Sequence, residues 1–232
     1  LWGIQLIFGM ILAVYPIFIC LGIVSLISII MNGGGRIVRL GIRKALQLHA
    51  NIVGVEYKSV KDPSINRNGQ YLLLADFRSI IDITAILVTA PKEDTVTVIR
   101  KHNFYIPLLG WCLKAAKYIP FQRHKPRQMF KNLVEVMNTT NLSFVYFPRG
   151  HTEEISDLKD LPKNYLKLIH LLKLDVIPIR LKDEEHYKFD VIPRLTTTVN
   201  YGKPISFSTL SKMSNDEIHE MIFHEIYKNS LC

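Results

Sequence analysis

The chain has 232 residues, of which 48% are hydrophobic, and this is enough for one domain with a substantial core. Cys20, Cys112 and Cys232 lie far apart in the sequence, which excludes a disulfide framework and gives no metal-binding spacing. The formal net charge is +9, but no helix-turn-helix, zinc or RNA-binding signature accompanies it, so we expect no nucleic-acid partner.

The first 32 residues carry no charged side chain, and Gln5 is the one strongly polar residue before Asn32. About 20 apolar residues are enough to span a bilayer. The run fits either a single tilted helix or two short helices that bend at Pro16 and enter and leave the same leaflet. A buried helix of a soluble core is the alternative, but an uncharged run of this length favours the membrane. We therefore expect residues 1–34 to form a membrane-embedded helical segment.

Four basic residues follow this run within a short stretch: Arg36, Arg39, Arg43 and Lys44. Basic residues beside a membrane segment tend to stay on the cytoplasmic side, and each is attracted to anionic lipid by about 1 kcal/mol near the surface. We therefore expect residues 35–232 to form a domain on the cytoplasmic side of a membrane, with membrane lipid as a partner.

The rest of the sequence alternates between strand-like and helix-like patterns. Short apolar runs predict strands at residues 71–74, 95–99, 143–147, 176–181 and 196–201. Apolar residues at helical spacing predict helices around residues 80–89, 108–116, 126–139, 163–174 and 215–231. This alternation predicts an α/β fold with a mixed, largely parallel sheet covered by helices, preceded by the N-terminal membrane helix or helix hairpin.

Four segments at or after the ends of these strands contain polar or glycine residues suited to a ligand site. LLLADFRSIIDI ends a strand with Asp76 and places Asp82 near the start of a helix. KYIPFQRH contains Arg123, and DVIPIRL carries Pro178 within a strand. FVYFPRGHTEE ends a strand before Gly150, which allows the backbone to approach a ligand closely. Ligands of α/β folds bind beyond the carboxyl ends of the strands.

In this order, the four motifs resemble those of the glycerophospholipid acyltransferase family, whose best-known members are the lysophosphatidic acid acyltransferases. The family carries Asn-His-x4-Asp, then a strand motif ending in Arg, then Phe-Pro-Glu-Gly, then a Val-Pro segment. Here the motifs read Asp-Phe-x4-Asp at residues 76–82, Ile-Pro-Phe-Gln-Arg ending at Arg123, Phe-Pro-Arg-Gly at residues 147–150 and Val-Ile-Pro at residues 176–178. The stretches RKHNFYIPLLGW and YGKPI also resemble family segments, and the similarity covers about residues 35–210.

The resemblance implies a role for each motif. The family's His takes the proton from a glycerol hydroxyl as that hydroxyl attacks an acyl thioester, and the Asp that matches Asp82 orients this His. The Arg that matches Arg123 pairs with the phosphate of the acceptor. The third motif, with Pro148, Gly150 and the nearby Thr152, helps to hold the glycerol phosphate. The implied acceptor is a lysophospholipid, the implied donor is acyl-CoA or acyl carrier protein, and no metal or other cofactor is expected.

The chain departs from the family pattern at the residues that carry the chemistry. Phe77 occupies the position of the His and has no hydrogen-bonding group. Arg149 occupies the position of the Glu, which reverses the charge there. General-base assistance typically contributes about 10²–10⁴-fold to a rate. The sequence therefore predicts a membrane-bound family member that is catalytically inactive or severely impaired.

An active acyltransferase with an unusual base is the alternative. Asp76 stands where the family has Asn, and three histidines, His102, His124 and His151, lie in neighbouring segments. Such an enzyme would move an acyl chain to the free hydroxyl of a lysophospholipid such as 1-acyl-glycerol-3-phosphate. A spare His more often bonds a backbone group than replaces a catalytic residue, so the inactive form is favoured.

Overall fold

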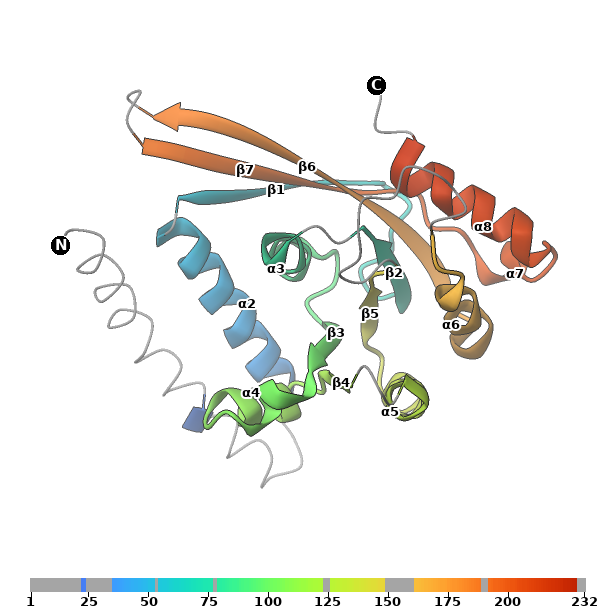
Figure 1. The fold of residues 1–232 in the computed structure, drawn as a ribbon, viewed down its shortest axis with the longest axis horizontal. Coiled ribbons are helices and arrows are strands. Elements are labelled where there is room, and N and C mark those ends of the chain that lie inside the picture. Colours follow the sequence, from blue (N-terminus) through green and yellow to red (C-terminus); the bar gives the residue numbers. More distant parts are fainter. Residues whose placement is uncertain are drawn as a thin grey trace.

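The computed structural model describes residues 22–23, 35–52, 54–76, 79–122, 126–148, 161–188 and 192–228. A seven-stranded sheet with the order β1-β7-β6-β2-β5-β3-β4 runs through this part of the chain (Figure 1). The strands are β1 Val55–Lys61, β2 Tyr71–Ala75, β3 Thr95–Arg100, β4 Ile119–Phe121, β5 Ser143–Tyr146, β6 Asp175–Lys188 and β7 Ile192–Tyr201. The helices are α2 Gly35–Ile52, α3 Ile80–Thr89, η1 Lys101–Tyr105, α4 Leu109–Ala115, α5 Pro126–Thr139, α6 Asn164–Leu172, α7 Phe207–Leu210, α8 Asn215–Phe223 and η3 His224–Lys228.

Five of the six strand pairs in this sheet are parallel, and β6 with β7 is the antiparallel one. β6 and β7 form a long hairpin that reaches past the ends of their neighbours (Figure 1). Helices separate the parallel strands along the chain, as parallel connections require. The predicted α/β fold with a mixed, largely parallel sheet is confirmed.

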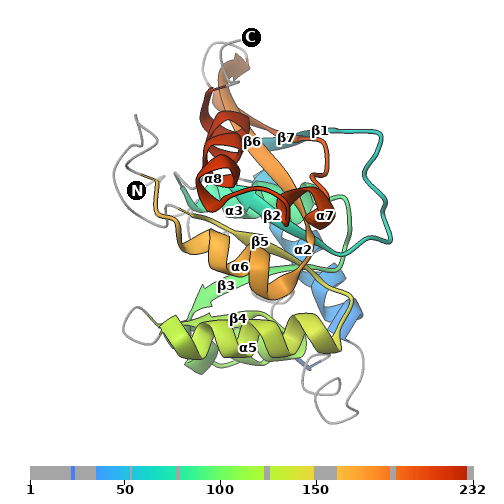
Figure 2. The same cartoon turned by 90° about the vertical axis from the view of Figure 1, so that its right-hand side faces the viewer.

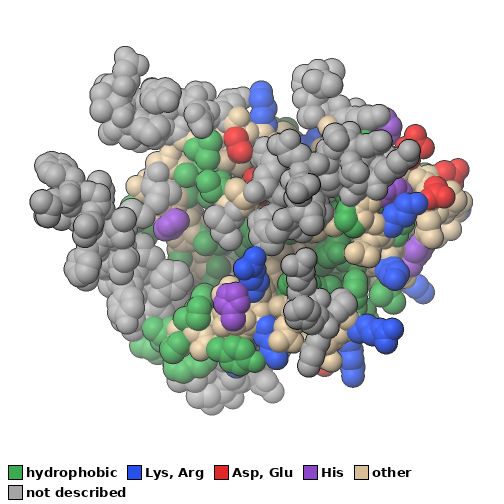
Figure 3. Space-filling view, viewed as in Figure 1, with side chains coloured by type: hydrophobic (Ala, Val, Ile, Leu, Met, Phe, Trp, Pro, Cys, Tyr) green, Lys and Arg blue, Asp and Glu red, His purple; other side chains and the backbone are tan. Residues whose placement is uncertain are grey.

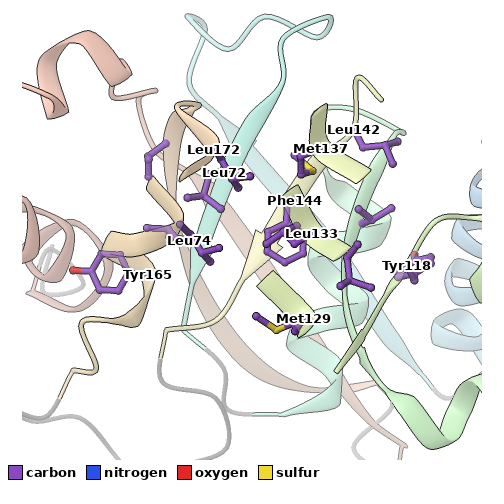
Figure 4. Close-up of a cluster of buried hydrophobic side chains, with 14 of the residues drawn as sticks. Leu72, Leu74, Tyr118, Met129, Leu133, Met137, Leu142, Phe144, Tyr165 and Leu172 are labelled. Carbon is purple, nitrogen blue, oxygen red and sulfur yellow. The ribbon is translucent and has the colours of Figure 1, made fainter. Parts of the chain in front are cut away.

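Strand β2 lies in the middle of the sheet and shows how both faces are covered. Leu72 and Leu74 belong to one hydrophobic cluster, while Leu73 and Ala75 belong to another, because successive side chains of a strand point to opposite faces. Helices α5, α6 and α8 lie over the first face (Figure 2), and α3 contributes to the second. Figure 4 shows the first cluster, in which β2 and β5 face α5 and α6 through Leu72, Leu74, Phe144, Leu133 and Tyr165.

Helix α2 directs basic side chains toward the domain. Arg39 Nε and Nη2 donate to Asp94 Oδ1 at 3.0 and 2.7 Å, and the Arg39 side chain is only 10% exposed. Arg43 Nη2 donates to the Ala90 carbonyl at 3.4 Å. Residues four apart share one face of a helix, and this face of α2 packs on the domain. Arg39 and Arg43 therefore bond to the domain, and the attraction of the basic cluster to anionic lipid stays a prediction.

The prediction of a membrane-embedded segment at residues 1–34 falls almost entirely outside the described residues, because only Gly22 and Ile23 of this range are described. Within the described ranges, no helix is both long enough and apolar enough to cross a membrane.

Candidate functional site

The carboxyl ends of four neighbouring parallel strands meet at one edge of the sheet. Leu74 of β2 pairs with Tyr146 of β5, and Arg100 of β3 pairs with Phe121 of β4. β3 and β5 are also hydrogen-bonded neighbours, and strands lie about 4.8 Å apart, so β2 and β4 are separated by roughly 14 Å. The first, second and third motifs each follow one of these strand ends. The fold therefore brings the three motifs to one edge, where α/β folds bind ligands.

The fourth motif lies beside the first. Pro178 of β6 pairs in register with Leu74 of β2, and the Pro178 carbonyl accepts a hydrogen bond from the Gly202 amide at 2.9 Å. Gly202 is the second residue of YGKPI, the stretch at 201–205 that resembles the closing segment of the family. A Cβ atom at Gly202 would come 3.0 Å from Pro178 Cγ, so this close approach favours glycine.

Two of the predicted site residues, Asp82 and Pro148, are among the described residues. Pro148 is buried and lies two residues beyond the end of β5. The other predicted site residues lie outside the described residues: Phe77, Arg123, Arg149, Gly150 and Thr152.

Asp82 is fully buried in the first turn of α3. Its Oδ2 atom accepts a hydrogen bond from the Ser79 amide at 2.8 Å, and the Asp82 amide donates to the Ser79 carbonyl at 3.2 Å. The first amides of a helix lack partners within the helix, and a carboxylate placed there is stabilised by them and by the helix dipole. Asp82 thus has a structural role as a helix cap.

Asp76 contacts the C-terminal part of the domain. The Tyr227 hydroxyl, from the π-helix η3, donates to Asp76 Oδ1 at 3.2 Å. Sequence patterns do not indicate this contact, because 151 residues separate the two side chains. The structure therefore adds Tyr227 to the surroundings of the first motif.

Two tyrosines stand close to the same edge of the sheet. Burial raises the pKa of the Tyr57 hydroxyl; a hydrogen bond with Thr84 opposes this shift, and the negative charge of Asp82 adds to it. Burial also raises the pKa of Tyr146, the last residue of β5. Both phenols are protonated at neutral pH, so neither can accept the proton of an alcohol. Tyr57 lies on β1, a strand that the sequence patterns do not predict.

The described residues offer no arrangement suited to a metal ion, since no group of three or more His, Cys, Asp or Glu side chains comes together among them. The chemistry available at the described part of the edge is therefore hydrogen bonding and charge: the carboxylates of Asp76 and Asp82 and the protonated hydroxyls of Tyr57 and Tyr146.

Comparison with known proteins finds similarity to acyltransferases, both in a family model and in curated relatives. The family model described as "Acyltransferase" matches residues 56–182. A 1-acyl-sn-glycerol-3-phosphate acyltransferase from Limnanthes douglasii is 28% identical over 167 residues, which are 69% of this chain and 58% of the relative. One from Streptococcus pneumoniae (strain ATCC BAA-255 / R6) is 24% identical over 163 residues, which are 69% of this chain and 59% of the relative. The chain thus spans just under three fifths of the length of these curated relatives.

A solved structure shares the fold. The crystal structure of the 1-acyl-sn-glycerophosphate acyltransferase PlsC from Thermotoga maritima aligns with a TM-score of 0.60 over 95% of this chain and 95% of its own, at 13% sequence identity. The seven-stranded sheet and the helices on its faces therefore form an arrangement already known from a solved protein.

Proposed function

The chain belongs to the acyltransferase family, and from this premise we propose that it is a membrane-bound, lysophosphatidate-type member that binds lipid but has lost acyl transfer. The observation that carries the proposal is the first motif, in which Phe77 precedes Asp82 at the family spacing. In the family pattern this Asp orients a His. Here its carboxylate caps α3 by accepting the Ser79 amide, a role that needs no imidazole.

Acyl transfer to an alcohol requires a group that removes the hydroxyl proton during attack on the thioester. Phe77 cannot do so, and the Tyr57 and Tyr146 phenols are protonated. Asp82 is buried and hydrogen-bonded. The loss of the base alone should lower the rate of acyl transfer by about 10²–10⁴-fold.

The sequence retains a basis for binding an anionic lipid. Arg123 remains at the position where the family has its phosphate-binding Arg, and Arg149 adds a second positive charge where the family has Glu. Guanidinium groups bind phosphate through paired, charge-assisted hydrogen bonds. We therefore propose lysophosphatidate as a ligand. An acyl donor such as acyl-CoA or acyl carrier protein is the matching second ligand, and the proposed location of the domain is the cytoplasmic side of a membrane.

Restoring the two substituted positions tests the proposed cause of inactivity. We expect little gain from Phe77→His alone, because Arg149 still disturbs the acceptor site, and less from Arg149→Glu alone, because nothing removes the hydroxyl proton. The double variant should exceed the product of the single effects, since residues of one catalytic unit are not additive. We expect it to raise acyl transfer from acyl-CoA to lysophosphatidate by about 10²-fold.

The control adds Asp82→Asn to the double variant. Asn keeps an oxygen that can accept the Ser79 amide, so α3 retains its cap, but it cannot stabilise a protonated imidazole. We expect this change to abolish the gain while circular dichroism stays unchanged. Strong transfer by the unmodified chain would favour the alternative of an active enzyme with another base, and a folded double variant without activity would refute the assigned cause.

A further inference from the structure

Three apolar or aromatic side chains of the η1–α4 segment are exposed. Tyr105 is 71% exposed, Ile106 46% and Trp111 39%. The same segment sends Phe104 and Leu113 into the core, so its inner side is already used for packing. Figure 3 shows hydrophobic side chains gathered at the lower left, where Figure 1 places α4. Exposed aromatic and aliphatic side chains that cluster in this way mark an interaction surface.

The exposure is fixed by the fold. The Gly110 amide donates to the Ile106 carbonyl at 2.8 Å, and a Cβ atom at Gly110 would come within 2.2 Å of the Phe104 carbonyl oxygen. η1 and the start of α4 are therefore packed backbone to backbone. The connecting Leu108 has a φ of 65°, a conformation that a residue with a side chain adopts only where its surroundings hold it.

The charged residues of this stretch of the sequence all have the same sign. From Thr95 to Val134 the sequence contains eight Lys and Arg residues and no Asp or Glu. Lys114 and Lys117 are exposed on and just after α4, and Lys114 shares a helix face with Trp111, three residues earlier. Lys101 Nζ lies 5.9 Å from the centre of the Tyr105 ring. Aromatic and aliphatic side chains rimmed by lysines are typical of segments that rest at the interface of an anionic bilayer.

We infer that Tyr105, Ile106, Trp111, Lys114 and Lys117, here called the bilayer face, dock on the surface of an anionic membrane. Gly22, from the uncharged N-terminal run, lies against this segment, because a Cβ atom there would come 2.5 Å from Leu108 Cδ2. η1 also leaves the sheet at the edge where the motifs gather, directly after β3. A bilayer is thus the occupant that fits both the positive charge of the lysines and the contact with Gly22, which belongs to an uncharged stretch of the sequence. The inference does not depend on whether the protein transfers acyl chains.

Tryptophan fluorescence tests this inference in the full chain. The sequence contains two tryptophans, Trp2 and Trp111, so Trp2→Phe leaves Trp111 as the sole reporter. On vesicles of phosphatidylglycerol and phosphatidylcholine we expect its emission to shift to shorter wavelength. Lipids brominated near the headgroup should quench it more than lipids brominated at the chain ends, because an interfacial segment inserts to a shallow depth. Lys114→Glu with Lys117→Glu should reduce this quenching.

The matched control moves the reporter to another part of the surface. Leu171 is 52% exposed and belongs to α6, a helix on the right of Figure 1, whereas α4 lies at the lower left. In Trp2→Phe with Trp111→Phe and Leu171→Trp, we expect no quenching. Vesicle binding without any change in Trp111 emission would overturn the inference. Equal quenching at positions 111 and 171 would also overturn it. A blue shift of Trp111 without bromine quenching would overturn it as well, because it would mean that protein, such as a second copy of the chain, covers this face.

Discussion

Asp82 lies in the first turn of α3, where its buried carboxylate accepts the Ser79 amide at 2.8 Å. The amides at the start of a helix and the helix dipole both favour a negative charge there. Neither interaction involves an imidazole. The helix therefore gives a reason for an aspartate at this position that does not depend on residue 77.

We predict that Asp82→Ala lowers the free energy of unfolding by about 1–2 kcal/mol, because the partly buried Ser79 amide loses its acceptor. Asp82→Asn, which keeps an acceptor oxygen, should lower it less. Urea denaturation followed by circular dichroism measures both changes. Asp216→Ala is the matched control, since Asp216 also lies in the first turn of a helix, α8, but its side chain is exposed. If Asp82→Ala and Asp216→Ala lowered the free energy of unfolding equally, the buried cap would stabilise the protein no more than an exposed acidic residue does.

The sequence predicts part of the candidate site. The order of the motifs indicates that they follow successive strands, and parallel strands bring their ends to one edge, where Asp82 and Pro148 are found. The contact between Tyr227 and Asp76 and the charge of Asp82 near Tyr57 are not predictable in this way. Both join distant parts of the chain, and a tertiary contact of this kind leaves no periodic pattern in either segment.

At the scale of elements, α6 and α8 are joined through a buried polar pair. The Tyr165 hydroxyl and His219 Nδ1 lie 2.8 Å apart, and the two rings stack with their centres 5.9 Å apart. Burial raises the pKa of Tyr165, so its hydroxyl keeps its proton. A hydrogen bond between buried groups fixes the relative position of the two helices, because its loss is costly in surroundings that exclude water.

We predict that Tyr165→Phe lowers the free energy of unfolding by about 1–2 kcal/mol, since the hydroxyl of a buried pair is removed without a change in ring packing. Chemical denaturation measures the effect. Tyr105→Phe removes the same hydroxyl from a side chain that is 71% exposed, and it should leave the stability almost unchanged. Similar values for the two variants would contradict a stabilising role for the Tyr165–His219 hydrogen bond.

The helices and strands with clear apolar patterns were predictable, while several others were not. α3 and α5 have the predicted bounds, 80–89 and 126–139. β1 has the burial pattern of an edge strand, with five of its seven residues exposed, so it lacks an apolar run. β6 continues to Lys188 through the charged stretch KDEEHYK because β7 pairs with it there. Pairing with a neighbour, which the local sequence does not encode, sets these bounds.

At the scale of the whole molecule, the candidate site and η1, where the bilayer face begins, lie at the same edge of the sheet. The first and third motifs follow β2 and β5, and η1 follows β3 beside them. A protein that takes its ligand from a membrane needs such an arrangement, because the acyl chain of a lysophospholipid stays in the apolar layer. Of the basic residues of α2, Arg39 and Arg43 bond to the domain.

The central claim is that the family fold persists without the family chemistry, and acyl transfer by the unmodified full chain tests it most directly. Purified protein in lipid vesicles would receive radiolabelled acyl-CoA and lysophosphatidate, with calorimetric binding measured in parallel. We predict no transfer above background, and tighter binding of lysophosphatidate than of an uncharged monoacylglycerol. Arg123→Ala should weaken lysophosphatidate binding by about tenfold to a hundredfold, because a charge-assisted hydrogen bond is lost, and leave monoacylglycerol binding nearly unchanged. Sustained transfer by the unmodified chain would contradict the account.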